Sequence, residues 1–266
     1  MKKDIFKNIS LENIQKSLNT EFIGKNIIYY DTTDSTNLQA KIHHDAPDGT
    51  VFLSEHQTAG RGRLERSWQS LPNSGIYMSI LLKPKPLPSN ISAITLILGL
   101  SAAISIEKFS KLPVFIKWPN DIVINSKKVC GILTELTGKE NTSIVAGIGI
   151  NVNTEEFDES LKEIATSIAL ENNAFIDRES LFQDLLYEFE KNYKIFLIKG
   201  FDSFKNEYEN RCITLNRELH IITPLETYKA HGVGINDSGA LIIDKDGERK
   251  VISSGEVSVR GVYGYI

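Results

Sequence analysis

The sequence predicts an α+β fold in which helices pack on a largely antiparallel sheet and a small β-barrel follows. Two observations support this class. Residues 1–212 combine strand-like apolar runs with two long helical patterns. Residues 213–266 contain short strand-like runs separated by turn sequences. We therefore expect two domains, with the boundary between residues 212 and 213.

The elements of the first domain can be assigned in chain order. Ser10 is a suitable N-cap for a short helix over 10–19, and a second short helix follows the polar turn at 31–36. We expect a long apolar helix over 91–106 and an amphipathic helix over 181–196, where apolar residues recur every three or four positions. The remaining apolar runs are predicted strands, at 27–30, 50–54, 76–82, 114–118, 122–124, 129–136 and 143–152.

The second domain is predicted to consist of short strands alone. The segments 236–239 and 244–247 carry the Gly, Asn and Asp residues that tight turns require. This alternation of short strands and turns is typical of a small barrel. The predicted strands are 219–222, 227–235, 240–243, 250–252 and 257–260.

Composition and charge exclude several classes of protein. The 266 residues include 30 Lys and Arg against 34 Asp and Glu, so the net charge of −4 argues against a broad DNA-binding surface. Two cysteines, Cys130 and Cys212, are too few for a disulfide-stabilised secreted fold. The apolar run at 91–106 is shorter than the roughly 20 residues that span a membrane, and the N-terminus lacks the apolar core of a signal peptide. We expect a cytoplasmic protein that does not bind a membrane.

The segment 57–73 is a long polar loop with an unusual concentration of guanidinium groups. Glycines allow close backbone approach to a ligand, and arginines match phosphate or carboxylate oxygens in a bidentate manner. Trp68 would close over an apolar or aromatic part of that ligand. A solvated basic loop that binds nucleic acid is the alternative. The residues concerned are Gly60, Arg61, Gly62, Arg63 and Arg66.

Three further segments place polar or small residues at the ends or faces of predicted elements. Lys117 ends an apolar strand just before Pro119, which suits a charge directed into a site, although a surface lysine is the simpler interpretation. Asp34-Ser35-Thr36-Asn37 opens a helix, where hydroxyls either cap the helix or bind a small polar group. The alternating Gly147 and Gly149 leave a bare strand face on which a planar ring can lie. Gly131 likewise permits close approach.

Taken in order, these motifs resemble those of the biotin–protein ligases, or biotin–[acetyl-CoA-carboxylase] ligases. The resemblance extends over residues 27–260, nearly the whole chain. Its two most specific motifs are the glycine/arginine loop and K-W-P-N-D. The matching segments are D-S-T-N at 34–37, G-R-G-R-x-x-R-x-W at 60–68, K-W-P-N-D at 117–121, G-I-L-x-E at 131–135, G-I-G-I-N-V-N at 147–153 and G-E-V-S-V-R at 255–260.

The resemblance implies a fold, a reaction and partners. The fold would be a catalytic core like that of class II aminoacyl-tRNA synthetases, followed by an SH3-like β-barrel. The reaction would form biotinyl-5′-AMP from biotin and ATP with Mg²⁺. Biotin would then pass to a lysine on the biotin carboxyl carrier domain of a carboxylase. A homodimer is common in the family, but the sequence does not determine the oligomeric state.

The resemblance also assigns residues, and it leaves the metal ligands unknown. Lys117, Arg61 and Arg63 are the expected catalytic residues, because adenylation needs positioned cations more than a covalent nucleophile. Cys130 is expected to be a small buried side chain rather than a nucleophile. The expected biotin- and ATP-binding residues are Ser35, Thr36, Asn37, Gln57, Gly60, Arg61, Gly62, Arg63, Trp68, Lys117, Gly131, Asn151 and Arg260.

Three other functions remain as alternatives. A lipoate– or octanoate–protein ligase shares the fold and the chemistry, but its loop differs from G-R-G-R-x-x-R-x-W. A biotin-sensing, DNA-binding repressor would need a winged-helix module, for which the 33 residues before Asp34 are too few. A biotin-binding module without activity would not need Lys117 and Arg61. We expect a monofunctional ligase. Its acceptor is expected on another protein, because this chain has no lysine flanked by methionines. For Glu65 the sequence leaves two roles open, a pairing with Arg66 or an effect on loop closure, and it assigns no role to the tail 262–266.

Overall fold

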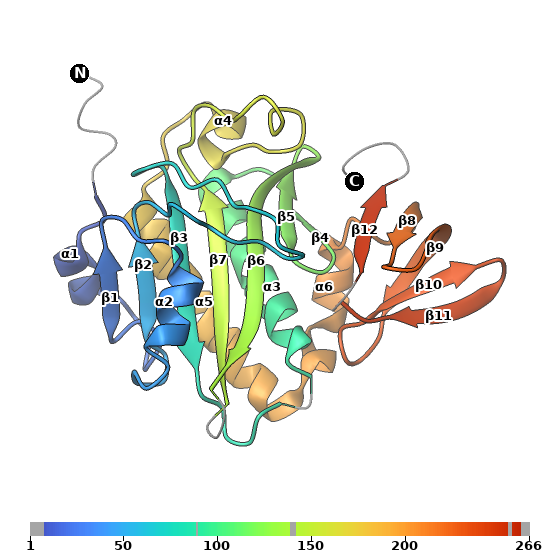
Figure 1. Cartoon of the computed structure of the whole chain (residues 1–266), viewed down its shortest axis with the longest axis horizontal. Helices are drawn as coiled ribbons and strands as arrows, with labels where there is room; N and C mark the ends of the chain where they lie inside the picture. Colours follow the sequence, from blue (N-terminus) through green and yellow to red (C-terminus); the bar gives the residue numbers. More distant parts are fainter. Residues whose placement is uncertain (1–7, 89, 139–141, 255–256, 262–266) are drawn as a thin grey trace.

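Two sheets and several helices make up the chain, as the computed structural model shows (Figure 1). The structure describes residues 8–88, 90–138, 142–254 and 257–261. A large sheet carries the N-terminal part of the chain, and a smaller sheet at its side carries the C-terminal strands. The predicted α+β class is confirmed. The start of the chain, Gly255-Glu256 and the tail, all singled out in the sequence, lie outside the described residues.

The large sheet has seven strands in the order β1-β2-β3-β7-β6-β5-β4. Only the β1–β2 pair is parallel; every other neighbouring pair is antiparallel. The central strands β3 and β7 are buried along their whole length, as their continuous apolar runs require. The strands are β1 (Ile27–Tyr30), β2 (Val51–Ser54), β3 (Gly75–Leu82), β4 (Phe115–Lys117), β5 (Asp121–Ile124), β6 (Lys127–Thr137) and β7 (Ser143–Asn151).

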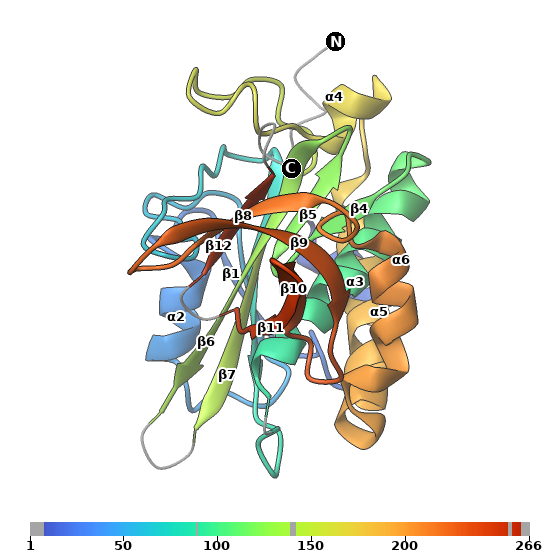
Figure 2. The ribbon, with the colours of Figure 1, turned by 90° about the vertical axis from the view of Figure 1, so that its right-hand side faces the viewer.

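The helices lie on opposite faces of this sheet (Figures 1 and 2). The helices α3 (Ser92–Ser110) and α5 (Arg178–Lys199) pack against each other and cover one face. The helix α3 is long and apolar enough to span a membrane, but most of it is buried inside the protein. It is therefore a core helix, as predicted. The short helix α2 (Thr36–Ile42) lies on the other face, where Ala40 packs against Phe52 of β2.

The remaining helices are short. In α1 (Leu11–Ser17) the Ser10 hydroxyl accepts from the Asn13 amide, which confirms the predicted cap. The sequence predicts no helix at α4 (Ile168–Asn172), η1 (Phe201–Phe204) or α6 (Lys205–Arg211), where the structure has one. Helices of this length are marginal by themselves and depend on tertiary packing, so their sequences carry little periodicity.

The smaller sheet consists of five antiparallel strands in the order β11-β10-β9-β8-β12. The five predicted strands are therefore present. Asp246 and Gly247 adopt φ values of 57° and 85°, the left-handed conformation that the β10–β11 turn needs. At the proposed domain boundary, the Ile213 amide donates to the Ile116 carbonyl of the edge strand β4 at 2.9 Å. The chain therefore passes beside β4 before it enters the smaller sheet. The strands are β8 (Glu218–Ile222), β9 (Thr227–Ile235), β10 (Leu241–Lys245), β11 (Glu248–Ile252) and β12 (Ser258–Gly261).

Candidate active site

A cavity of about 690 Å³ lies over the large sheet, between the loop 57–73 and the strand β12. The predicted site residues are spread over the first 260 residues, and all but one line this cavity. Gly60 is the exception. A Cβ atom there would lie 2.6 Å from the Trp68 carbonyl oxygen, so this glycine permits close packing within the loop. The predicted residues in the lining are Ser35, Thr36, Asn37, Gln57, Arg61, Gly62, Arg63, Trp68, Lys117, Gly131, Asn151 and Arg260.

A row of residues across four strands forms the floor of the cavity. Lys117 of β4 lies opposite Asp121 of β5, and Asp121 lies opposite Gly131 of β6. Gly131 in turn lies opposite Gly149 of β7. Residues directly opposite each other in an antiparallel pair project to the same face. The floor therefore has two charged side chains at one end and two bare glycines beside them.

The glycine floor is covered by the indole ring of Trp68. A Cβ atom on Gly149 would lie 2.5 Å from Trp68 Cε2, and one on Gly131 would lie 2.9 Å from Trp68 Cζ3. The planar ring expected on the bare face is thus the protein's own tryptophan. Trp68 Nε1 and Gln69 Oε1 are buried and have no hydrogen-bond partner in the part of the chain that the structure describes. Such atoms are rare in folded proteins and are consistent with a site that binds a polar ligand.

Gly147 makes room for a different side chain, that of Asn37. A Cβ atom on Gly147 would lie 1.9 Å from Asn37 Oδ1. Asn37 Oδ1 accepts from the Ser79 hydroxyl at 2.6 Å, and its Nδ2 donates to Glu135 at 2.8 Å. The amide group of Asn37 therefore binds protein groups and holds the start of α2 on the sheet, although the residue lines the cavity.

The start of α2 corrects the predicted helix cap. Ser35 occupies the N-cap position with an extended backbone, but its hydroxyl makes no capping hydrogen bond. Instead the Thr36 amide donates to Gln57 Oε1 at 2.8 Å, and Gln57 Nε2 donates to the Ser70 hydroxyl at 3.1 Å. The Gln57 carboxamide thus replaces the cap, and the buried Ser35 hydroxyl takes no part in it.

The glycine/arginine loop is a small hairpin rather than an irregular segment. The backbones of Arg61 and Ser67 form an antiparallel β-bridge, and the Gly62 amide donates to the Arg66 carbonyl at 2.7 Å. Its tip is Leu64-Glu65, with φ values of 55° and 57°. Residues with side chains avoid this left-handed conformation at a cost of about 1–2 kcal/mol each, so the tip is strained. A pairing of Glu65 with Arg66, one of the two roles left open for Glu65, is absent among the described residues.

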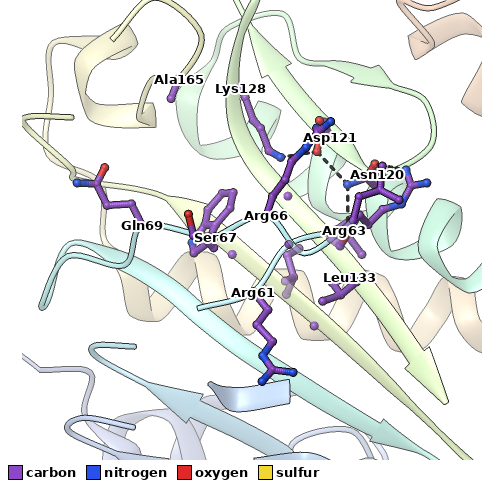
Figure 3. Close-up of a pocket in the computed structure, with 18 of the residues that line it drawn as sticks. Arg61, Arg63, Arg66, Ser67, Gln69, Asn120, Asp121, Lys128, Leu133 and Ala165 are labelled. Carbon is purple, nitrogen blue, oxygen red and sulfur yellow. Dashed lines mark hydrogen bonds and ion pairs between the residues drawn. The ribbon is translucent and has the colours of Figure 1, made fainter. Parts of the chain in front are cut away.

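The arginines of the loop point in different directions (Figure 3). Arg63 donates to Asn120 Oδ1 at 2.9 Å and to the Val257 carbonyl at 3.1 Å, and it also donates to the Ser254 carbonyl. Its guanidinium group therefore connects the loop to the C-terminal sheet. Arg61 is exposed and points away from this group.

Lys117 is a buried cation, with only 6% of its surface exposed. Burial is the main reason that the pKa of its ammonium group is lowered to about 8; Asp121 opposes this shift, and nearby Lys128, Arg260 and Arg66 add to it. This region of the cavity holds several cations close together. Such an arrangement favours an anionic ligand, because the ligand would relieve the repulsion among them.

Several residues of the cavity lie outside the motifs that the sequence singles out. Lys128 pairs with Asp121 at 2.6 Å. Phe157, Leu161 and Ile164 line the cavity from the segment between β7 and α4. Their spacing of four and three residues resembles an amphipathic pattern, but that spacing alone does not indicate which surface they cover. Asn151 Nδ2 donates to the Thr166 carbonyl at 3.1 Å and holds this segment in place.

Cys130 is fully buried, and burial raises the pKa of its thiol, so it does not supply a thiolate nucleophile. This agrees with its predicted structural role.

In residues 8–88, 90–138, 142–254 and 257–261 no group of three or more His, Cys, Asp or Glu side chains is placed to hold a metal ion. The site therefore offers cations, amide groups and a planar floor.

Comparison with known proteins decides the family. Residues 28–153 match the biotin/lipoate A/B protein ligase family, and residues 214–260 match the biotin protein ligase C-terminal domain. The bifunctional ligase/repressor BirA of Bacillus subtilis strain 168 is 35% identical over 257 residues, which cover 94% of this chain and 79% of BirA. This chain belongs to the biotin protein ligase family.

Two further relatives agree with this assignment. The biotin–[acetyl-CoA-carboxylase] ligase of Paracoccus denitrificans is 30% identical over 239 residues, which cover 86% of this chain and 98% of the relative. The structure of the Aquifex aeolicus biotin protein ligase in complex with biotin and ATP has a TM-score of 0.82 and 35% identity, covering 89% of this ligase and 99% of that chain. The prediction of a biotin ligase, rather than a lipoate or octanoate ligase, is confirmed.

Proposed function

We propose that this ligase activates biotin with ATP and transfers it to a lysine of a carrier domain. In the first step an oxygen of the biotin carboxylate attacks the α-phosphorus of ATP and pyrophosphate leaves, which gives biotinyl-5′-AMP. In the second step the neutral amine of the acceptor lysine attacks the biotinyl carbonyl carbon, and AMP leaves. The amine loses a proton as the amide forms.

The observation that carries this proposal is the buried Lys117 at the end of the floor. Its ammonium group lies beside Asp121 and close to the cations Arg66, Lys128 and Arg260. Adenylation develops negative charge on the phosphate oxygens, and fixed cations in a site shielded from water stabilise that charge. We assign Lys117 the contact that bridges the biotin carboxylate and the α-phosphate.

The predicted catalytic arginines receive different roles. Arg61 is exposed at the cavity and makes no contact with the Arg63 group, so it is available to an entering carboxylate or phosphate. Arg63 contacts Asn120 and the carbonyls of the C-terminal sheet. We therefore propose that Arg63 acts mainly by holding the loop over the substrates, and that Arg61 acts on them.

The two ends of the cavity suit the two substrates. We assign the biotin ring system to the end lined by Ser35, Thr36 and Gln57, where hydroxyl and amide groups suit a ureido group. The nucleotide is assigned to the other end, formed by Asn151, Arg260 and the apolar residues of the segment 155–165. Trp68 would lie between the two and shield the reacting groups from water.

Mg²⁺ would enter the site with ATP, as the counter-ion of its phosphates. Asp121 is the one carboxylate among the described cavity residues, and it is already paired with Lys128. This donor set fits a metal ion held mainly by phosphate oxygens and water, as is usual for Mg²⁺. When bound, the ion would help to neutralise the pyrophosphate leaving group.

The partner that we propose is the biotin carboxyl carrier domain of a carboxylase. A cytoplasmic location and the absence of DNA binding remain predictions from the sequence. A homodimer is also compatible with the chain. A biotin-dependent regulator is the second candidate function, because the BirA relative of B. subtilis is named as both ligase and repressor.

The test is ATP–pyrophosphate exchange by the purified protein with biotin, lipoate, octanoate or no acid. Exchange with biotin alone is the expected result. Exchange with lipoate or octanoate would contradict the substrate assignment. Tight biotin binding without exchange, together with a gel shift on DNA, would favour the regulator instead.

A further inference from the structure

A chain of polar side chains lies behind the end of the cavity that we assign to the biotin ring system. Ser79, in the middle of β3, is fully buried. Its hydroxyl oxygen lies 2.6 Å from Asn37 Oδ1 and 2.8 Å from Thr36 Oγ1. Asn37 continues the chain to Glu135, which forms an ion pair with Lys41 at 2.6 Å. The chain therefore runs from an ion pair between α2 and β6 to a hydroxyl group of the cavity.

The Glu135 carboxylate fixes the direction of each hydrogen bond in this chain. A carboxylate in an ion pair accepts hydrogen bonds and has no proton to donate. It therefore takes one proton of the Asn37 amide group at 2.8 Å, and the Leu133 carbonyl takes the other at 3.2 Å. The reversed amide group would place its oxygen against both of these acceptors. Asn37 Oδ1 thus faces Ser79 and can only accept.

The hydroxyl group of Ser79 has one proton and cannot donate to both of its neighbours. Because Asn37 Oδ1 takes this proton, the Ser79 oxygen can only accept on the side of Thr36, and the Thr36 hydroxyl must supply the proton of the 2.8 Å contact. Gln57 Oε1 is farther from this hydroxyl, at 3.2 Å, and already accepts from the Thr36 amide at 2.8 Å. Toward the cavity, the Thr36 hydroxyl therefore presents lone pairs rather than a proton.

We propose that Ser79 is a positioning residue that makes Thr36 a hydrogen-bond acceptor, so that this end of the cavity selects the N–H group of a cyclic urea. The proposal rests on the placement of the biotin ring system under the proposed function. A ureido N–H would donate to Thr36, whereas a ring oxygen at the same place would face another acceptor. Ser79 acts through Thr36 rather than on the ligand, and it lies outside every motif identified in the sequence.

The first experiment measures the Kd of biotin for Ser79→Ala, with Ser105→Ala as the matched control. Ser105 is also fully buried, but it lies in α3, and its hydroxyl has no hydrogen-bond partner in the described part of the chain. In Ser79→Ala the Thr36 hydroxyl loses the acceptor that holds its proton away from the ligand. We expect the Kd to rise about tenfold, the order that one lost hydrogen bond costs. Ser105→Ala should bind biotin as the wild type does.

Biotin-dependent pyrophosphate exchange shows which substrate is affected. In Ser79→Ala the KM for biotin should rise about tenfold, while kcat and the KM for ATP stay within about twofold of the wild type. The reason is that the chain reaches the cavity only at the end assigned to biotin. Desthiobiotin keeps the ureido ring and lacks the sulfur, so its affinity should fall by the same factor as that of biotin.

Carbamate analogues of biotin, in which a ring oxygen replaces one ureido N–H, provide a readout that a general structural role would not move. The wild type should reject the analogue whose oxygen faces Thr36, since two acceptors then meet. In Ser79→Ala the Thr36 proton is free to bind that oxygen. The ratio of the Kd of this analogue to the Kd of biotin should fall at least about tenfold in Ser79→Ala. The ratio should not change in Ser105→Ala.

A double-mutant cycle tests whether Ser79 acts through Thr36. Residues that act through one another show non-additive effects. Thr36→Val removes the acceptor itself, so nothing remains for Ser79 to orient. Ser79→Ala combined with Thr36→Val should therefore bind biotin no more weakly than Thr36→Val alone.

Three results would overturn the proposal and leave the ligase activity in place. They are additive effects in the cycle, an unchanged ratio for the carbamate analogue in Ser79→Ala, and a lower melting temperature of Ser79→Ala with wild-type affinity for biotin. If the wild type binds biotin without exchange, the proposed adenylation fails, and the affinities still decide the role of Ser79. If the wild type binds no biotin, both the proposed function and the role of Ser79 are wrong.

Discussion

Lys117 is a residue whose protonation state should control the reaction. Burial lowers the pKa of its ammonium group to about 8, so the free ligase carries the charge below this pH and loses it above. The kcat/KM value reports the ionisation of the free enzyme. We expect kcat/KM for ATP to fall about tenfold per pH unit above pH 8. A flat profile to pH 9.5 would contradict the role of the ammonium group.

Variants of Lys117 give the matching control. Lys117→Arg keeps its charge at high pH, so any activity that it retains should show no fall above pH 8. Lys117→Ala should lose about 100- to 1000-fold in rate, as expected for one charge contact in the transition state. Both rates are measured by pyrophosphate exchange at saturating biotin.

Gly149 tests the contact between the floor and Trp68. In Gly149→Ala the new methyl group would lie 2.5 Å from Trp68 Cε2, so the indole ring must move. Because the ring belongs to a surface loop, we expect a melting temperature close to that of the wild type and a rise of at least about tenfold in the KM for biotin and ATP. Gly99→Ala is the control, since its Cβ atom meets Ile132 at an ordinary 3.5 Å. Equal kinetics in the two variants would contradict the assigned contact.

At the scale of elements, a buried ion pair joins three of them. Arg178, at the start of α5, donates to Glu55 at 2.7 Å just after β2 and to the Gly75 carbonyl at 2.8 Å in β3. Glu55 also accepts from the Ile9 amide at 2.6 Å. The pair therefore connects the N-terminal segment, the sheet and α5 at one edge of the core.

Arg178→Met should lower the free energy of unfolding by about 3–5 kcal/mol, because it leaves the Glu55 carboxylate buried without its cation. Adding Glu55→Gln should recover part of this loss, since the uncompensated charge is then gone. Urea unfolding of the two variants measures both values. A loss below 1 kcal/mol in Arg178→Met would show that the pair is not important for stability.

At the scale of the whole molecule, side chains of the catalytic core fasten the C-terminal sheet, among them Trp118 and Arg63. Trp118 Nε1 donates to the Gly239 carbonyl at 3.0 Å in the β9–β10 turn. Arg63 donates to carbonyls on both sides of residues 255–256. The Arg63 contact lies next to β12, whose Arg260 lines the cavity. The substrate site is therefore complete only when both sheets are in position.

Arg63→Ala should therefore loosen the C-terminal sheet at a distance from the reacting groups. We expect faster amide hydrogen exchange in β12 and in the end of β11, together with a lower rate of pyrophosphate exchange. Arg61→Ala should lower activity without changing hydrogen exchange in those strands. The same exchange pattern in both variants would refute the connecting role of Arg63.

Much of the fold and of the site could be predicted because the signals are local. Apolar runs bounded by turn residues identified the strands. The cap and periodicity of Ser10–Asn19 and the periodicity of the 181–196 segment identified their helices. The short helices α4 and α6 escaped because packing, rather than propensity, forms them. Phe157, Leu161 and Ile164 escaped because their spacing alone did not indicate which surface they cover.

The sequence by itself determined the fold class, the order of the elements, the family and the need for cations in the chemistry. The tertiary structure decided which partner each polar side chain takes. It assigned the Asn37 amide to Ser79 and Glu135, the Arg63 guanidinium to the C-terminal carbonyls, and Trp68 to the glycine floor. The physical reason is that these contacts join residues tens to nearly two hundred positions apart, so neither partner carries a local signal for the other.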